Sequence, residues 1–259
     1  MQLNYRQYSD SGKPLLILHG LFGSLGNWGW HSKQLAEQYA VYGVDLRNHG
    51  ESPHADELDY TSMADDVKQL MTSLGIDSCF CIGHSMGGKV AMQLALTQPQ
   101  LVEKLIVVDI APVTYPIGAE GHKKVLAAMA ALDFDAIHSR SEAESKLAAF
   151  IQDEATRKFV LTNLQRDDSG KYQWRLNLRA IEEHYDALRI KPNGVLAFTK
   201  PTLFVKGSES KYIRAENETE ILELFPNASV KIIMQAGHWL HADKPQAFKK
   251  IASDFLSMK

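Results

Sequence analysis

The sequence is poor in cysteine, with only Cys79 and Cys81 in 259 residues. Both fall in one short apolar run that we expect to be a strand, where side chains two residues apart point to the same side at a spacing of about 7 Å. That spacing is poor geometry for a disulfide, and a zinc site would lack its other ligands nearby. We therefore expect two small, buried core residues in a reducing environment.

The sequence also lacks a strong charge of either sign and any long apolar run. Its net charge of −3 gives no reason to expect a nucleic acid or an anionic membrane as a partner. No apolar stretch approaches the roughly 18 residues that suggest a membrane span, and the polar residues 1–6 do not resemble a signal peptide. We expect a soluble, cytoplasmic protein that acts on a small molecule, and we assign it no oligomeric state.

The most informative feature that is present is a G-x-S-x-G box at Gly83–Gly87. An apolar run at 79–82 precedes the box, and a helical pattern at 89–97 follows it. A serine between a strand and a helix lies on a tight, strained turn that exposes its hydroxyl group. The flanking glycines let the strand and the helix pass close to each other. This context predicts that Ser85 is a nucleophile rather than a residue of a purely structural turn.

Short apolar runs alternate with helical patterns along most of the chain. The runs are apolar on both faces, as are the strands of a parallel sheet that helices cover on both sides. The alternation predicts an α/β fold with a doubly wound, mostly parallel sheet, to which residues 4–8 could add an antiparallel strand. The expected strands are 15–18, 41–44, 79–82, 105–108, 202–205 and 230–233, and the expected helices are 32–39, 62–74, 89–97 and 245–258.

A stretch of about 90 residues, 111–200, interrupts this alternation. A crossover helix needs far fewer residues, and a structureless loop of that length is implausible inside a compact domain. We therefore predict a helical cap (lid) at 111–200, inserted into an α/β core formed by 1–110 and 201–259. The expected cap helices are 119–132, 133–140, 141–152, 154–164 and 179–188, with a short extended segment at 171–176.

Reactive residues follow the expected strands, at the edge where open α/β sheets bind their ligands. Ser85 follows one strand, and His238 follows the last one. An imidazole can take the serine proton during nucleophilic attack and return it later, and a carboxylate can orient that imidazole. We predict that Ser85 and His238 act together with one carboxylate. His241 could form a metal pair with His238, but no acidic motif completes such a site, and we expect no metal.

Two carboxylates compete for the position of the acid. Glu209 is the only acidic residue in the run 207–210, which follows the strand at 202–205. Asp109 follows the strand next after the serine strand, in a loop that could aim its carboxylate at His238. These grounds favour Asp109. Glu209 remains the alternative acid, and a structural role for Asp109 in capping its loop is the other interpretation.

The oxyanion that forms during acyl transfer needs two backbone N–H groups to stabilise it. Met86, directly after the nucleophile, is one expected donor. Leu21, in the glycine-containing loop after the first parallel strand, is the other. We expect His19 to brace this loop, and Asp45 and Arg47 to tie neighbouring loops together.

Taken together, the motifs resemble those of the α/β-hydrolase-fold carboxylesterases, and most of all those of a bacterial esterase. The likeness covers nearly the whole chain and implies a cofactor-free enzyme that hydrolyses short- to medium-chain acyl esters through an acyl-enzyme on Ser85, with acyl thioesters as an alternative substrate class. It also implies that the acid follows the strand after the nucleophile strand, which is the position of Asp109. The motifs are Leu18–Ser24, Asp45–Ser52, Gly83–Lys89, Asp109–Val113 with Tyr115, Tyr172–Asn177 and Gly237–Trp239.

Apolar residues near the expected centre suggest a substrate with a modest apolar acyl group. Because a fold does not fix the chemistry, C–C bond hydrolysis, perhydrolysis and ligand binding without turnover are alternative functions. A haloalkane dehalogenase is disfavoured, since it would need a carboxylate where Ser85 stands. The expected pocket residues are Phe22, Trp28, Met86 and Trp239 from the core, and Val125, Leu126, Met129 and Leu132 from the cap.

Overall fold

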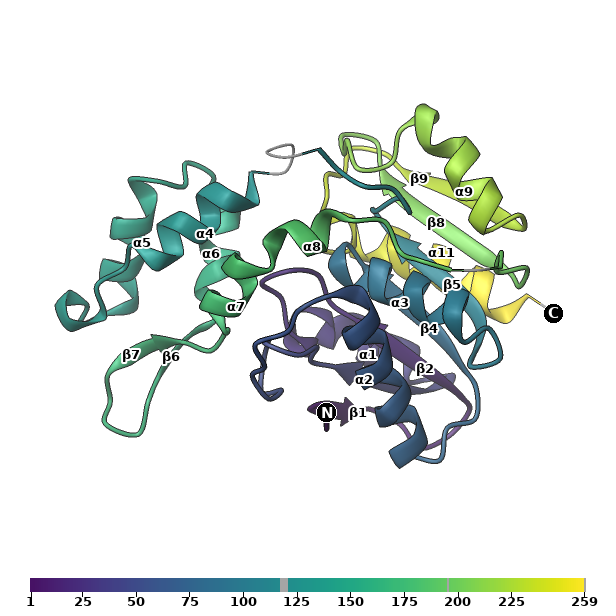
Figure 1. Ribbon diagram of the computed structural model, residues 1–259, viewed down its shortest axis with the longest axis horizontal. Helices are drawn as coiled ribbons and strands as arrows, with labels where there is room; N and C mark the ends of the chain where they lie inside the picture. Colours follow the sequence, from purple (N-terminus) through teal and green to yellow (C-terminus); the bar gives the residue numbers. More distant parts are fainter. Residues whose placement is uncertain (117–120, 195, 259) are drawn as a thin grey trace.

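A computed structural model describes residues 1–116, 121–194 and 196–258. Within them, a seven-stranded sheet has the strand order β1-β3-β2-β4-β5-β8-β9 (Figure 1). All neighbouring strands are parallel except β1, which pairs antiparallel with β3. The strands are β1 (Tyr5–Gln7), β2 (Lys13–Leu18), β3 (Tyr39–Val44), β4 (Cys79–His84), β5 (Val102–Val108), β8 (Thr202–Gly207) and β9 (Ala228–Ile233).

Helices cover both faces of the sheet, which confirms the predicted doubly wound architecture. On one face, α1 (Gly29–Leu35) contacts α11 (Pro245–Ser257), and on the other α2 (Tyr60–Ser73) contacts α3 (Met86–Thr97). In α11, every fourth residue from Phe248 onward is buried, because this spacing places side chains on one side of a helix. None of the described helices is long and apolar enough to cross a membrane.

The predicted strands and core helices are present, with ends shifted by a few residues. The antiparallel strand expected at 4–8 is β1. Two short α-helices among the described residues had no counterpart in the prediction, α9 (Glu218–Leu224) and α10 (Leu240–Asp243), and neither had the 3₁₀ helices η1 (Leu25–Trp28) and η3 (Ala215–Asn217). The expectation that every strand is buried on both faces is wrong for β9, whose Val230 and Ile232 are 47% and 54% exposed. The reason is that β9 is the last strand of the sheet.

The segment between β5 and β8 is mainly helical, and most of it lies beside the sheet, on the left in Figure 1. The helix predicted at 133–140 is instead a short 3₁₀ turn, and the one predicted at 154–164 ends earlier because Leu164 pairs with Trp174 in a hairpin. Residues 119–120 of another predicted helix lie outside the described residues. The elements are α4 (His122–Ala130), η2 (Phe134–Ala136), α5 (Arg140–Ala148), α6 (Glu154–Leu161), β6 (Leu164–Arg166), β7 (Tyr172–Trp174), α7 (Leu178–Glu183) and α8 (Tyr185–Arg189).

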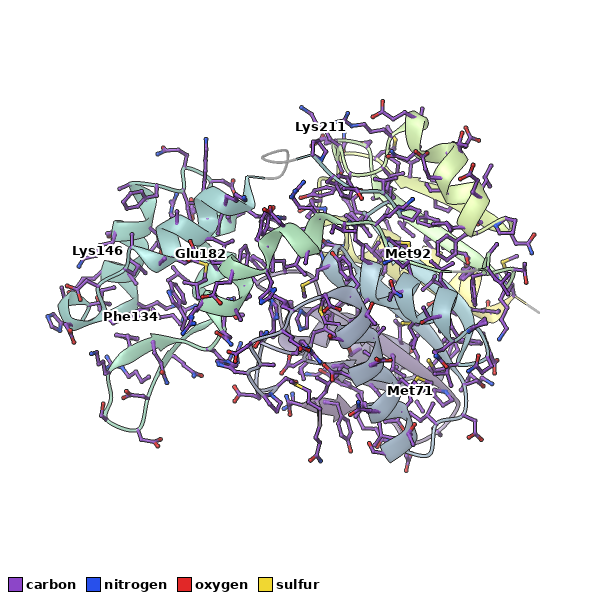
Figure 2. The ribbon with its side chains drawn as sticks, in the orientation of Figure 1. Met71, Met92, Phe134, Lys146, Glu182 and Lys211 are labelled. Atoms are coloured by element: carbon purple, nitrogen blue, oxygen red, sulfur yellow. The ribbon has the colours of Figure 1, made fainter. Side chains whose placement is uncertain are left out.

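Hydrogen bonds join this inserted segment to loops of the core. The Asn177 N–H donates to the carbonyl oxygen of Asn48 at 3.1 Å, and the Asn177 side-chain amide donates to Asn48 Oδ1, also at 3.1 Å. Asn163 Nδ2 donates to the carbonyl oxygen of Phe22 at 2.7 Å, in the loop after β2. Figure 2 shows the side chains of both parts, with Glu182 marking the inserted segment. The loops that follow β2 and β3 therefore contact the insertion directly.

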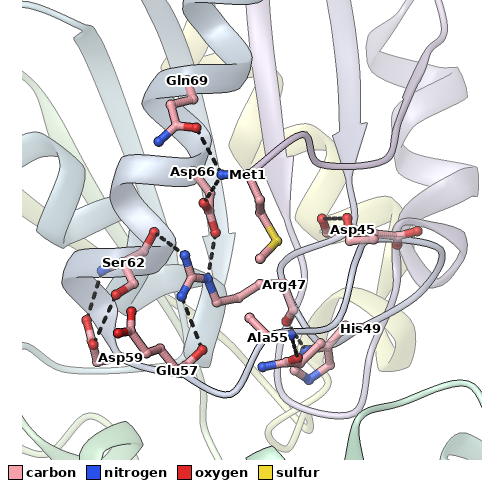
Figure 3. A network of polar contacts seen from close by, with 12 residues as sticks. Met1, Asp45, Arg47, His49, Ala55, Glu57, Asp59, Ser62, Asp66 and Gln69 are labelled. Atoms are coloured by element: carbon pink, nitrogen blue, oxygen red, sulfur yellow. Dashed lines mark hydrogen bonds and ion pairs between the residues drawn. The ribbon is translucent and has the colours of Figure 1, made fainter.

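Asp45 and Arg47 tie loops together, as predicted. Arg47 Nε pairs with Asp66 Oδ2 of α2 at 2.6 Å, and the same guanidinium donates to the carbonyl oxygen of Ser62 (Figure 3). Both partners of the ion pair are buried, and their pairing offsets the cost of removing each charge from water. Asp45 accepts a hydrogen bond from the Leu25 N–H at 2.7 Å. The loop after β3 is thus held to α2 on one side and to the loop after β2 on the other.

Gly87 of α3 lies directly against the end of β2, and this contact leads to a stability prediction. A Cβ added there would lie 2.4 Å from the carbonyl oxygen of His19 and 2.5 Å from that of Leu18. We expect Gly87→Ala to lower the free energy of unfolding by about 2 kcal/mol or more, as overpacking does. Gly29→Ala is the matched control, because Gly29 has helical backbone angles and its added Cβ meets nothing closer than 3.9 Å. Urea unfolding measures the difference, and equal stability of the two variants would contradict this account.

Candidate active site

Ser85 lies on the turn between β4 and α3, with a φ of 51° and a ψ of −118°. A positive φ is uncommon for a residue other than glycine and persists only where the surroundings hold it. The Ser85 N–H donates to the carbonyl oxygen of Val108 in β5 at 3.0 Å. A Cβ on Gly83 would lie 2.3 Å from the carbonyl oxygen of Gly87, so the close approach of strand and helix requires glycine at this position. The turn places Ser85 in the wall of a cavity.

A hydrogen bond of 2.8 Å joins His238 Nδ1 to Asp109 Oδ2. Asp109 directly follows β5, is fully buried and, like Ser85, has a positive φ, in this case 52°. The Gly207 N–H donates to Asp109 Oδ1 at 3.1 Å, and Ser210 Oγ donates to Oδ2. These donors compensate for the burial of the carboxylate. Because Nδ1–H donates to a carboxylate, the neutral ring presents Nε2 as its proton acceptor.

Glu209, the alternative acid, is an exposed residue of the loop after β8. Its backbone N–H donates to the carbonyl oxygen of Ala236, and its carboxylate forms no hydrogen bond with any described residue. The sequence prediction does not include the neighbouring Ser210, which does contact Asp109, because the expected partner of His238 in the run 207–210 is a carboxylate. The signal that the sequence offers is a hydroxyl group in a loop that is expected to lie near the site.

Ser85 and His238 line the same cavity, so the structure brings the predicted nucleophile, base and acid to one edge of the sheet. Among the described residues, no hydrogen bond links Ser85 Oγ to the imidazole. Such bonds are often long or misaligned until substrate binds, so the arrangement is compatible with proton transfer. Tyr212 stacks on the His238 ring with 4.0 Å between centroids, which restricts the plane of the imidazole.

Leu21 and Met86, the predicted oxyanion donors, both lie beside Ser85. Met86 is the first residue of α3, where backbone N–H groups have no acceptor within the helix. The Leu21 N–H has no hydrogen-bond acceptor among the described residues. The next residue, Phe22, has a φ of 61°, which bends the loop at this point. Both N–H groups are therefore available to an oxygen atom bound near Ser85.

His19 braces the loop that carries Leu21, as predicted. Its Nδ1–H donates to the carbonyl oxygen of Gly20 at 2.8 Å, and its Nε2 accepts a hydrogen bond from the Leu46 N–H at 3.0 Å. Burial lowers the pKa of His19, which favours the neutral ring that these two bonds require. His19 therefore connects the loops after β2 and β3.

His238 packs against a group of neutral histidines, which includes His84 and His241. His84 Nε2 lies 3.0 Å from the His238 carbonyl oxygen, and the His84 ring lies 4.8 Å from the His238 ring and 4.7 Å from the His241 ring. Burial holds the pKa of His84 and of His241 well below the usual range, so neither adds a charge. The expectation that Trp28 flanks the substrate is wrong. Trp28 stacks on His241 at 4.2 Å and is only 1% exposed, because its ring covers the histidines inside the core.

The cavity that Ser85 and His238 line has a volume of about 400 Å³ and is bounded by residues of both the core and the inserted segment. Phe22, Trp239 and Val125 line it, whereas Met86 lines a smaller cavity beside it. Among the described residues, no three His, Cys, Asp or Glu side chains form a group that could hold a metal ion. The other apolar residues expected from the insertion are buried core side chains, namely Leu126, Met129 and Leu132.

A family model described as alpha/beta hydrolase fold matches residues 13–245. The chain is 40% identical to the sn-1-specific diacylglycerol lipase ABHD11 of Mus musculus, over 96% of the chain and 82% of that protein. It is 32% identical to Esterase YbfF of Escherichia coli, over 99% of the chain and 100% of that protein. A solved structure of a marine microorganism esterase has a TM-score of 0.96 at 40% identity, covering 98% of this chain and 99% of that one. These matches confirm the resemblance to α/β-hydrolase-fold esterases.

The contact between His238 and Asp109 predicts which carboxylate the activity needs. We expect Asp109→Asn to lower kcat on a p-nitrophenyl ester by about 10⁴, because an amide holds the imidazole in the wrong tautomer. Glu209→Gln is the matched control at an exposed position and should leave kcat unchanged. Circular dichroism checks that both variants are folded. If Glu209→Gln lowers kcat strongly while Asp109→Asn keeps its activity, the assignment is reversed and Glu209 is the acid.

Proposed function

The chain belongs to the α/β-hydrolase fold family, and from this membership we propose that it is a serine carboxylesterase. Its proposed substrates are short- to medium-chain acyl esters, and acyl thioesters, which react through an acyl-enzyme on Ser85. The observation that carries the proposal is the 2.8 Å hydrogen bond between His238 and the buried Asp109, beside a cavity that Ser85 also lines. Relatives named esterase and lipase support hydrolysis of a small-molecule ester.

In the proposed acylation step, Ser85 Oγ attacks the ester carbonyl carbon while His238 Nε2 accepts the hydroxyl proton. The carbonyl oxygen becomes an oxyanion, which the N–H groups of Leu21 and Met86 stabilise. The carboxylate of Asp109 stabilises the imidazolium that has formed. When the intermediate collapses, the bond to the alcohol oxygen breaks, and His238 gives its proton to that oxygen.

The deacylation step repeats these events with water in place of the alcohol. Water gives a proton to His238 and attacks the acyl carbon, and the new oxyanion uses the same two N–H groups. Collapse of this intermediate breaks the bond to Ser85 Oγ, which takes the proton back from His238. The products are a carboxylic acid and the free enzyme. Protein groups carry every step, so the proposed cycle uses no cofactor.

Covalent labelling with a fluorophosphonate tests the proposed nucleophile. We expect the label on Ser85, and we expect Ser85→Ala to remain unlabelled and to lose about 10⁶ in kcat. Ser253→Ala, which removes a serine of α11 outside the cavity, is the matched control and should keep both labelling and turnover. A wild-type protein that stays unlabelled would refute the proposal. A protein that is labelled but hydrolyses no p-nitrophenyl ester would fit one of the other functions of this scaffold.

The acid side of the pH profile tests His238 as the general base. Protonation of the imidazole removes the acceptor that Ser85 needs, so kcat/KM should fall on acidification and reach a slope of about tenfold per pH unit. Burial holds the pKa of His84 well below its ordinary value, so we expect no second acidic limb from this neighbour. The measurement is kcat/KM for p-nitrophenyl acetate between pH 5 and 8. A constant rate over that range would exclude His238 as the base.

A further inference from the structure

Two cavities of very different size meet at Ser85. The larger has a volume of about 400 Å³, and the smaller has a volume of about 20 Å³. Leu21, Ser85, His122 and Tyr212 line both cavities, so the nucleophile lies at their junction. An ester that reacts with Ser85 carries two groups on its carbonyl carbon besides the oxyanion, the acyl chain and the alcohol. The two cavities offer one place for each.

The position of His238 decides which group enters which cavity. His238 lines the larger cavity and is not among the described residues that line the smaller one. The alcohol oxygen must receive the proton of His238 as its bond breaks, so the alcohol has to lie on the side of the larger cavity. Water must then attack from the place that the alcohol has left, which requires access to solvent. The larger cavity has such access, since Phe150 in its wall is 59% exposed.

The smaller cavity has a wall that the core holds in place. Helix α8 contributes Leu188 to this wall, and Tyr60 OH donates a hydrogen bond to the Leu188 carbonyl oxygen. Lys89 Nζ donates to the carbonyl oxygens of Arg189 and Ile190 at 2.9 and 2.8 Å. Lysine at the C-terminal end of a helix is a favourable arrangement, because it satisfies carbonyl groups that have no partner within the helix. A cavity of this size has room for about one water molecule or one methyl group, and α8 cannot move outward without breaking these bonds.

We propose that the substrate binds with its acyl group in the smaller cavity and its alcohol in the larger one. The preferred substrates are then esters that combine an acyl group of about the size of acetyl with an extended, apolar alcohol. The wall of the larger cavity suits such an alcohol, because Phe22, Val125, Phe159, Val160 and Trp239 contribute apolar surface to it. This inference rests on the proposed function and gives its substrate an orientation.

Two substrate series on the wild-type enzyme test the orientation. The first varies the acyl chain, with p-nitrophenyl acetate, butyrate and octanoate. The second varies the alcohol, with methyl, butyl and octyl acetate. We expect kcat/KM to fall at least about tenfold from acetate to octanoate, because a small pocket discriminates against added methylene groups. We expect it to rise at least about tenfold from methyl to octyl acetate, because each methylene group gains from burial. A flat or rising acyl series would overturn the orientation.

A pair of variants assigns each preference to its cavity. Leu188→Ala enlarges the smaller cavity and should shift the acetate-to-butyrate ratio of kcat/KM about tenfold toward butyrate. Val125→Ala, the matched control in the larger cavity, should leave that ratio unchanged and reduce the preference for octyl over methyl acetate. If Leu188→Ala does not fold, Leu188→Val takes its place. This variant removes less volume and should shift the acetate-to-butyrate ratio of kcat/KM in the same direction. If Val125→Ala moves the acyl ratio and neither Leu188 variant does, the acyl group lies in the larger cavity and the orientation is wrong.

The two proposals fail in different ways. Hydrolysis that persists in Ser85→Ala, or no hydrolysis in either series, contradicts the proposed serine esterase. Hydrolysis that depends on Ser85 but prefers long acyl chains and small alcohols leaves the esterase intact and overturns only the orientation.

Discussion

The arrangement of the candidate site depends on the hydrogen bond between His238 and the Asp109 carboxylate. It joins side chains that are 129 residues apart in the sequence. A buried carboxylate is costly unless hydrogen bonds satisfy its oxygens, and Gly207 and Ser210 provide the remaining donors. All three partners can reach Asp109 because β5, β8 and β9 are neighbouring parallel strands, whose following loops leave the sheet at the same edge. The order of the strands, rather than any local motif, therefore creates this pair.

Several residues of the candidate site have strained backbone conformations. Ser85, Asp109 and Phe22 all have a positive φ, a conformation that costs about 1–3 kcal/mol for a residue other than glycine. Ser85 and Asp109 directly follow strands, and the N–H of each donates to the next strand, to the carbonyl oxygens of Val108 and Val205 at 3.0 and 2.8 Å. The sheet thus fixes both sharp turns. Each side chain leaves its strand in a direction that a regular extended chain would not allow.

Sequence patterns were sufficient for the sheet and its covering helices, because strands buried on both faces leave continuous apolar runs. They favour Asp109 over Glu209 but leave Glu209 as an alternative, since a firm choice depends on strand order and on the direction of each loop. The prediction is wrong for Trp28 because an aromatic residue near a reactive loop can fill either a pocket or the core, and here its ring covers His241. The sequence does not predict the role of Ser210, because a single serine in a loop carries no pattern until its carboxylate partner is known.

Apart from the four residues that line both, the two cavities beside Ser85 are bounded by different parts of the fold. The smaller is bounded by α8, which Tyr60 of α2 and Lys89 of α3 hold by hydrogen bonds to backbone carbonyl groups. Both of these helices pack on the sheet, so the core itself sets the size of this cavity. The larger is bounded by α4 and α6, in a segment that meets the core through contacts such as the hydrogen bond from Asn163 to Phe22. Substitutions in α6, or in α4 beyond His122, can therefore reshape the larger cavity without changing a residue that lines the smaller one, and the two halves of a substrate would be selected independently.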